Sequence, residues 1–217
     1  MPDFAELRER MVRHQIEARG IADPAILRAF DEVPREEFVD EKQRQWAYDD
    51  HPLPIEAGQT ISQPYIVAAM IEAAEIRPGD KVLEVGAGSG YAAAVMSHIA
   101  REVIGIERQH DLVEIAQKRL QRLGYHNVKI VAGDGTLGCS GEAPFDAILA
   151  AASGSHVPAS FVDQLAPGGR LVMPVGNPGG VQELVKVTKR PDGTTERKNL
   201  GGVRFVPLIG EEGWDES

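Results

Sequence analysis

An apolar segment that runs directly into a cluster of glycines constrains the fold of this chain most strongly. Residues 82–91 read Val-Leu-Glu-Val-Gly-Ala-Gly-Ser-Gly-Tyr. The apolar residues predict a buried strand, and the residues after the glycines predict a helix. Glycine at positions 86, 88 and 90 permits positive φ angles and lets a ligand approach the main chain closely. A strand, a glycine turn and a helix in this order indicate a nucleotide-type ligand.

Helical and strand patterns alternate from Ser62 onward, which predicts parallel crossovers with helices on both faces of a sheet. A turn at Pro191-Asp192-Gly193 predicts that the last two strands are antiparallel. The expected fold class is therefore α/β, a Rossmann-like doubly wound, mostly parallel sheet with an antiparallel C-terminal finish. We expect helices at about 62–74, 91–100, 111–123 and 158–165, and strands at 81–85, 103–107, 128–132, 145–149, 169–175, 183–188 and 204–208.

Residues 1–60 show no strand alternation. Asp3 precedes a helical apolar pattern that ends at Gly20, and Asp23-Pro24 begins a second helix that Pro34 ends. Residues 51–60 are predicted to form a loop. A length of 217 residues suits a single domain. We expect one domain over 1–217, with an N-terminal helical extension at 1–60 and an α/β core at 61–217.

Two acidic residues accompany the glycine turn. Glu84 lies two residues before Gly86, and Glu107 follows Gly90 by seventeen residues at the end of the next strand. A carboxylate in the position of Glu107 can accept both hydroxyls of a ribose. The Glu-x-Gly-x-Gly-x-Gly pattern places Glu84 where it would repel a pyrophosphate but attract the cationic groups of S-adenosylmethionine. The predicted cofactor is therefore S-adenosylmethionine.

A second turn, Gly133-Asp134-Gly135, follows the third strand at the same edge of the sheet. The Asp134 side chain and a neighbouring backbone N–H could bind the amino group and a ring nitrogen of adenine. The same residues would also suit an ordinary turn. Ser62, followed by Gln-Pro and an apolar run, has the pattern of a helix N-cap, although a serine there can also face a cleft.

The chain resembles the protein-L-isoaspartate O-methyltransferase family, whose Gly-Gln-Thr-Ile-Ser-Gln-Pro signature matches residues 58–64. Further blocks of the family pattern occur in order along the chain, at 12–16, 33–39, 53–65, 84–91, 133–135, 143–147, 168–176 and 205–208. The segments 151–156 and 211–217 depart from that pattern. The resemblance implies that Ser62 is the active-site residue. It implies that the cofactor is surrounded by Gln59, Thr60, Ile61, Ser62, Glu84, Gly86, Gly88, Glu107, Asp134 and Gly135, with no metal.

The resemblance also implies the reaction. The methyl group of S-adenosyl-L-methionine would pass to the free α-carboxylate of an L-isoaspartyl residue, and the ester would close to a succinimide that hydrolyses to aspartyl. The product cofactor would be S-adenosyl-L-homocysteine. The partners would be isoaspartyl peptides and proteins, bound near residues 203–207. Because this carboxylate is already ionised, Ser62 is expected to orient it and not to act as a nucleophile.

Composition argues against several partners. A net charge of −10 disfavours nucleic acid, and Lys118, Arg119 and Arg122 are predicted to form a solvated helix face. A single Cys139 gives no disulfide framework, and a charged N-terminus with no long apolar run predicts neither a leader nor a membrane span. We expect a cytoplasmic monomer that binds neither nucleic acid nor membrane.

Four other functions remain to be compared with this one. A nicotinamide dehydrogenase would need G-x-G-x-x-G and a separate substrate domain. An amino-methylating nucleic-acid enzyme would carry an Asn/Asp-Pro-Pro-aromatic motif where Leu149 leads into Ala-Ala-Ala-Ser. A non-catalytic binding module would lack Ser62 or the acidic residues. A metal-dependent O-methyltransferase would need ligand spacing. The six histidines do not show such spacing: His14, His51, His98, His110, His126 and His156.

Overall fold

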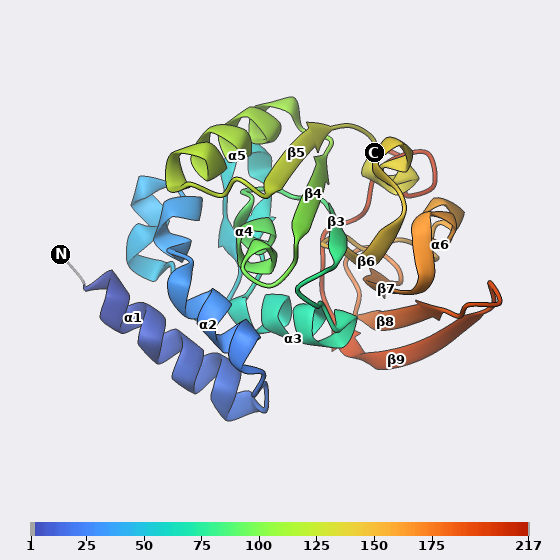
Figure 1. Ribbon diagram of the computed structural model, residues 1–217. Coiled ribbons are helices and arrows are strands. Elements are labelled where there is room, and N and C mark those ends of the chain that lie inside the picture. Colours follow the sequence, from blue (N-terminus) through green and yellow to red (C-terminus); the bar gives the residue numbers. More distant parts are fainter. Residues whose placement is uncertain (1–2, 217) are drawn as a thin grey trace.

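The computed structural model describes residues 3–216 and shows a seven-stranded sheet with helices on both faces (Figure 1). The helices are α1 (Phe4–Met11), α2 (Pro24–Glu32), α3 (Pro64–Ala74), α4 (Tyr91–Ser97), α5 (His110–Leu123) and α6 (Ala159–Gln164). Shorter helical turns are η1 (Val12–Ile16), η2 (Glu17–Arg19), η3 (Arg35–Phe38), η4 (Glu41–Trp46), η5 (Glu56–Gly58), η6 (Gly135–Leu137) and η7 (Ser140–Glu142). The strands are β1 (Leu53–Pro54), β2 (Thr60–Ile61), β3 (Lys81–Val85), β4 (Glu102–Glu107), β5 (Val128–Ala132), β6 (Phe145–Ala150), β7 (Leu165–Val175), β8 (Gln182–Lys189) and β9 (Thr195–Val203).

The strand order of the large sheet is β5-β4-β3-β6-β7-β8-β9. Strands β3 to β7 pair in parallel, whereas β8 and β9 are antiparallel to their neighbours. The chain leaves β3 toward β4 and β5 on one side and returns to β6 and β7 on the other. This reversal makes the carboxyl end of β3 a topological switch point, where ligands bind in such sheets. The predicted fold class is confirmed.

Two apolar cores lie on the two faces of the sheet. Val82 packs into the core formed with the N-terminal helices, α3, α4 and α5. Leu83 and Val85 point to the opposite face and pack with Phe161 of α6. This alternation follows from the period of two along a strand. Glu84 is on the same face as Val82, so its side chain is directed toward the helices that cover that face.

The N-terminal helices begin and end where their capping residues predict. Asp3 accepts hydrogen bonds from Ala5 N and Glu6 N, and Gly20 adopts a φ of 101° at the end of the first helical stretch. Asp23 caps α2, which has Pro24 in its first turn. The predicted loop at 51–60 is wrong in part. It contains an antiparallel pair of short strands, β1 and β2, that the two prolines obscured in the sequence.

The predicted last strand at 204–208 is wrong, although the antiparallel finish is confirmed. Strand β9 begins directly after the turn, with Thr195 opposite Lys189, and ends at Val203. Its residues are mostly polar and exposed because it is the edge of the sheet, so it has no apolar alternation to reveal it. Arg204 and the apolar residues 205–208 instead cross the carboxyl edge of the sheet, where Pro207 bridges to Ser153.

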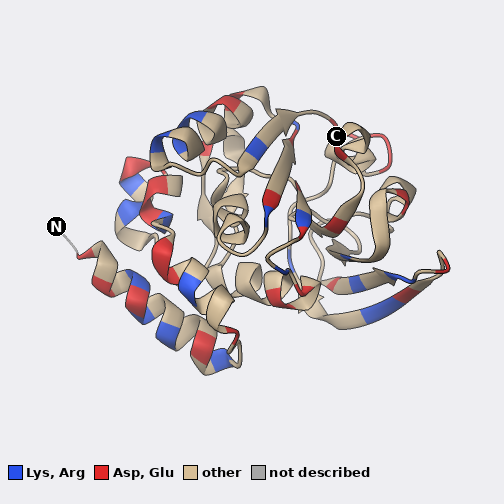
Figure 2. Ribbon diagram, in the orientation of Figure 1, with Lys and Arg blue, Asp and Glu red and all other residues tan. Residues whose placement is uncertain are grey.

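Acidic and basic residues alternate along the N-terminal helices and α5 (Figure 2). Within α5, Lys118 and Arg122 form exposed ion pairs with Glu114 and Glu37. The solvated-face prediction is wrong for Arg119, whose side chain is only 10% exposed. Its guanidinium faces the protein, where it donates to Glu56 and to the Ser89 carbonyl. None of the helices in residues 3–216 is long and apolar enough to cross a membrane.

Candidate active site

The predicted ligand-binding residues meet at the carboxyl edge of the parallel strands. The glycine turn follows β3, Glu107 ends β4, and Gly135 follows β5. Parallel pairing of β3 with β4 and of β4 with β5 brings these three points to adjacent positions. These three points are far apart along the chain, and the register of the sheet places them around one cleft.

The glycine turn is held in a fixed shape by its backbone. Gly86, Gly88 and Gly90 have φ angles of 80°, 51° and 85°, which side chains disfavour. The N–H groups of Gly86 and Ala87 both donate to the Ile106 carbonyl, at 2.9 and 3.2 Å. A Cβ at Gly90 would lie 3.1 Å from a Leu120 methyl group, so the turn also lets α5 pack closely.

Glu107 is a buried carboxylate whose two oxygens each accept a backbone hydrogen bond. Gly88 N donates to Oε2 and Gln109 N donates to Oε1, both at 3.0 Å. Its residue is 6% exposed and lines a cavity together with Gly86 and Gly88. The carboxylate is therefore oriented before any ligand binds, and its remaining lone pairs face the cleft that the sequence assigned to a ribose.

Glu84 presents the opposite case. It is 3% exposed, and its Oε2 has no hydrogen-bond partner among the described residues 3–216. Burial, and to a lesser degree the negative charge of Glu107, raises the pKa of Glu84 to about 8. A buried carboxylate with an unsatisfied oxygen is costly unless a donor or cation meets it. The position thus suits a positively charged ligand group, as the sequence predicted.

Both carboxylate oxygens of Asp134 accept hydrogen bonds from other residues of the protein. Oδ1 accepts from Thr136 N and Thr136 Oγ1, and Oδ2 accepts from Glu211 N at 2.8 Å. Burial acts to raise the pKa of Asp134, but the hydrogen bonds from Glu211 and Thr136 outweigh it and lower that pKa. Asp134 therefore fastens the C-terminal segment beside Gly135, which lines the same cavity as Glu107.

The segment that carries Ser62 crosses over this cleft. Leu53 pairs with Ile61 and Pro54 with Thr60, so the β1–β2 hairpin fixes the positions of residues 59–62. The N-cap prediction for Ser62 is wrong, because α3 begins at Pro64 and Gln63 occupies the cap position without a side-chain bond. Ser62 therefore lies one residue before the cap position.

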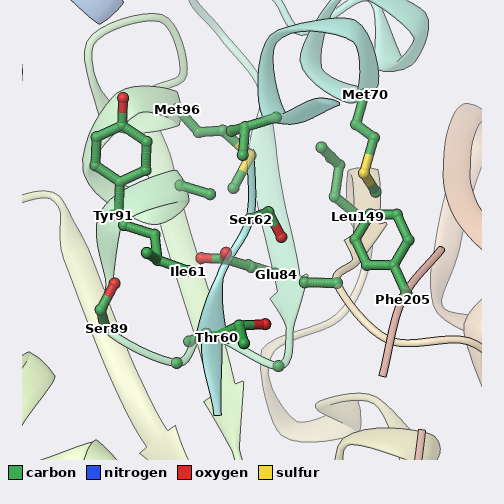
Figure 3. Close-up of a pocket in the computed structure, with 16 residues that line it drawn as sticks. Thr60, Ile61, Ser62, Met70, Glu84, Ser89, Tyr91, Met96, Leu149 and Phe205 are labelled. Carbon is green, nitrogen blue, oxygen red and sulfur yellow. The ribbon is translucent and has the colours of Figure 1, made fainter. Parts of the chain in front are cut away.

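Three cavities meet next to Ser62, which lines two of them. Thr60 and Ala151 line all three of them. The first is lined by Glu84 and Ser62, and the second is lined by Glu107 and Gly135. Ser62 also lines the third, a groove along residues 202–207. Figure 3 shows Ser62 and Glu84 directed into the first cavity, with Phe205 on its far side.

Several lining residues could not be recognised from the sequence. Met70, Met96 and Leu149 are buried side chains that line the first cavity, and their pattern is that of ordinary core residues. Leu208 and Ile209 reach the second cavity from a segment that was expected to be a strand and its end. Only the tertiary structure brings them there. Arg35, whose Nη2 donates to the Ser62 carbonyl, likewise carried no local signal of a role at the site.

Comparisons with known proteins agree with this geometry. A sequence model of the protein-L-isoaspartate(D-aspartate) O-methyltransferase family matches residues 6–213. Protein-L-isoaspartate O-methyltransferase 1 of Rhodopseudomonas palustris strain HaA2 is 56% identical over 97% of this chain and 86% of its own length. Protein-L-isoaspartate O-methyltransferase 2 of Pelobacter propionicus is 53% identical over 95% and 92%.

Two solved structures are similar over almost the whole chain. One is a protein-L-isoaspartate O-methyltransferase with a TM-score of 0.87 and 32% identity, over 95% of this chain and 67% of the other. The second is a Plasmodium falciparum protein described as a beta-aspartate methyltransferase, in complex with S-adenosyl-L-homocysteine. Its TM-score is 0.80 and its identity 29%, over 93% and 98% of the two chains. The chain therefore belongs to the protein-L-isoaspartate O-methyltransferase family.

Proposed function

We propose that methyl transfer takes place where the three cavities meet, with Ser62 facing both reactants. As a member of its family, the enzyme methylates the free α-carboxylate of L-isoaspartyl residues from S-adenosyl-L-methionine and so begins their repair to aspartyl through a succinimide. The observation that carries our placement of the reaction is that Ser62 lines both the cavity containing Glu84 and the groove along residues 202–207.

In this proposal Ser62 orients the carboxylate and leaves its proton state unchanged. An α-carboxyl has a pKa near ~3.5 and is ionised at neutral pH, so no general base is needed. The Ser62 hydroxyl donates to one carboxylate oxygen, which leaves the other free to bond to the methyl carbon. When bound, S-adenosylmethionine supplies that activated methyl group. Alignment of two reactants can contribute about 7 to 11 kcal/mol.

The residues of the first two cavities fit the cofactor. Glu84 would face its cationic end, because its unsatisfied buried oxygen calls for a donor or a positive charge. Glu107 would accept the ribose hydroxyls, and Asp134 with Gly135 would contact adenine through the lone pairs and N–H that remain. The walls between these groups would be formed by Gln59, Thr60, Ile61, Ser62, Gly86 and Gly88.

The peptide would lie in the third cavity. This groove contains two glycines, Gly179 and Gly202, and several apolar side chains, but its lining residues include a single charged side chain, that of Arg204. Few charged groups therefore restrict the side chains that flank the isoaspartyl residue. We expect the groove to bind the peptide mainly through its backbone, which suits damage that occurs in many proteins.

We also propose that the whole chain 1–217 acts as one domain without a metal. A carboxylate nucleophile needs no Lewis acid, and residues 3–216 contain no group of three or more His, Cys, Asp or Glu side chains placed to hold a metal ion. The strongly acidic composition supports a protein that binds neither nucleic acid nor anionic membrane. One free cysteine, Cys139, is compatible with the cytoplasm. A monomer is the simplest assembly.

Two matched peptides test this function. They are identical except for L-isoaspartyl or L-aspartyl at one position, and each is incubated with S-adenosylmethionine labelled in its methyl group. We expect a base-labile ester on the isoaspartyl peptide alone, with the same rate after treatment with a metal chelator. Equal labelling of both peptides would contradict the substrate, and loss of activity with the chelator would contradict the metal-free mechanism.

A further inference from the structure

Arg35 is a fully buried cation directly behind Ser62. Its side chain is 0% exposed. Its Nε donates to the Ala47 carbonyl at 2.7 Å, and its Nη2 donates to the Ser62 carbonyl at 2.8 Å. Its guanidinium carbon lies 4.7 Å from the centre of the Tyr91 ring. Burial lowers the pKa of Arg35, which reflects the cost of removing this charge from water.

These contacts join three segments that are far apart in the sequence. Ala47 follows the helical turn η4, Ser62 belongs to the active-site segment, and Tyr91 begins α4 after the glycine turn. Ser62 itself lies between the end of β2 and the start of α3, in a stretch with no regular backbone pairing. The Arg35 guanidinium therefore supplies a fixed main-chain anchor at the active-site residue.

A second buried arginine provides the comparison. Arg170 is 7% exposed and donates to the carbonyls of Ala74 and Glu75, at the opposite end of α3. It also pairs with the Asp80 carboxylate at 2.6 Å. The ion pairs found within residues 3–216 include none with Arg35. The guanidinium of Arg35 is thus met by carbonyl oxygens and an aromatic ring. Such an arrangement contributes little to stability, but the planar guanidinium fixes the directions of its hydrogen bonds.

We propose that Arg35 is a positioning residue for methyl transfer, because it fixes the main chain of Ser62 so that the Ser62 hydroxyl faces the junction of cofactor and peptide cavities. This inference rests on the orienting role proposed above for Ser62. Arg35 lines none of the three cavities and would touch neither reactant. Its effect on the reaction would pass entirely through Ser62.

The test compares Arg35→Lys with Arg170→Lys as a matched control. Lysine keeps the charge but lacks the planar fork that reaches two carbonyls. We expect Arg35→Lys to lower kcat for an isoaspartyl peptide by about ten- to a hundredfold, since small misplacements of reacting groups have effects of that size. The Kd for S-adenosyl-L-homocysteine should stay within about twofold of the wild-type value. Arg170→Lys should lower the unfolding midpoint without lowering kcat.

A double-variant cycle separates positioning from general damage. If Arg35 acts through Ser62, Arg35→Lys should lower kcat no further in a Ser62→Ala background. If the double variant instead shows the product of the two single-variant decreases in kcat, the proposal is overturned. A wild-type kcat in Arg35→Lys would also overturn it. The activity of Ser62→Ala alone is measured first, because full activity in that variant would instead refute the role of Ser62.

Arg35→Gln is a second variant that removes the buried charge and retains a side-chain N–H donor. We expect it also to lower kcat while S-adenosyl-L-homocysteine still binds. If both Arg35 variants lose cofactor binding together with their folded structure, Arg35 is a general structural residue and the proposal is overturned.

Discussion

The two ends of the cofactor cleft differ in how their carboxylates are satisfied. At the end where the ribose and adenine are expected, Glu107 and Asp134 accept hydrogen bonds from the protein through both oxygens. At the end where we propose that methyl transfer takes place, Glu84 lines a cavity together with Met70 and Leu149, and one of its oxygens has no partner within residues 3–216. The protein itself satisfies the carboxylates at the Glu107 end, whereas a ligand group would have to satisfy the remaining oxygen at the Glu84 end.

This difference has a physical consequence. A carboxylate that is already hydrogen-bonded loses little on binding a neutral ribose, so it contributes mainly geometry. A buried carboxylate without a partner has a raised pKa and gains most from a positive charge. The contribution of the Glu84 end to cofactor affinity should therefore depend on the charge of the cofactor. The contribution of the Glu107 end should depend on the shape of the ligand. Four predictions sharpen or break this contrast.

The largest effect is expected for Ser62→Ala. Removal of one oriented donor to reacting oxygen atoms typically lowers kcat by about 10² to 10³. Because Ser62 is proposed to contact the carboxylate, the Kd for S-adenosylmethionine should change by no more than about twofold. Single-turnover rates and equilibrium binding measure the two quantities separately. If Ser62→Ala weakened only cofactor binding, Ser62 would act on the cofactor and not on the peptide carboxylate, contrary to the proposal.

Glu107→Ala should come next. Loss of charge-assisted hydrogen bonds to the ribose, at about 1.5 to 3 kcal/mol, corresponds to a Kd for the cofactor raised about ten- to a hundredfold. The Gly88 and Gln109 N–H groups also lose their acceptor, so the glycine turn should loosen. Calorimetric titration with S-adenosyl-L-homocysteine measures the affinity. An unchanged Kd would show that Glu107 only supports the turn.

Glu84 should make cofactor binding depend on pH. Since its pKa is about 8 in the free protein, Glu84 is mostly protonated at pH 7 and mostly ionised at pH 9. A cation favours the ionised form, so affinity for S-adenosylmethionine should rise by about tenfold over this range, with proton release at pH 7. Titrations in two buffers of different ionisation enthalpy measure the released proton.

Glu84→Gln is the control for that titration, because the amino group of the cofactor ionises identically for both proteins. If the sulfonium charge dominates, wild type and variant should show the same pH dependence of affinity for S-adenosyl-L-homocysteine. The same raised pKa makes ionised Glu84 destabilising, so the free wild-type protein should lose stability as pH rises from about 4.5 to about 8. A wild-type pH profile in the variant would refute this account.

Asp134→Asn should have the smallest effect. The change weakens the hydrogen bonds from Thr136 and Glu211 that fasten the C-terminal segment, at a cost of about 1 kcal/mol. For a chain of this size that corresponds to an unfolding midpoint lower by about 2 to 4 °C. Thermal unfolding without ligand measures it. A much larger loss would mean that the C-terminal segment supports the core and not only the cleft.

Local chemistry along the sequence determined much of this protein. The apolar run before Gly86 and the positive φ angles that follow it are local properties, as are the caps at Asp3 and Asp23 and the turn before β9. Each depends on neighbours within a few residues, so spacing alone predicts it. The family signature at residues 58–64 was recognisable for the same reason, since its residues are contiguous, and it predicted the segment that carries Ser62.

The tertiary structure alone decided which distant groups meet. The edge strand β9 was misplaced because exposed polar residues carry no periodic signal, and Arg119 was misread because helical spacing does not show which carbonyls lie opposite. The state of Glu84 and the anchor at Arg35 likewise depend on burial and on partners remote in the chain. Desolvation and hydrogen bonding are fixed only when the chain is packed, so the sequence predicted candidate site residues and the fold set their electrostatics.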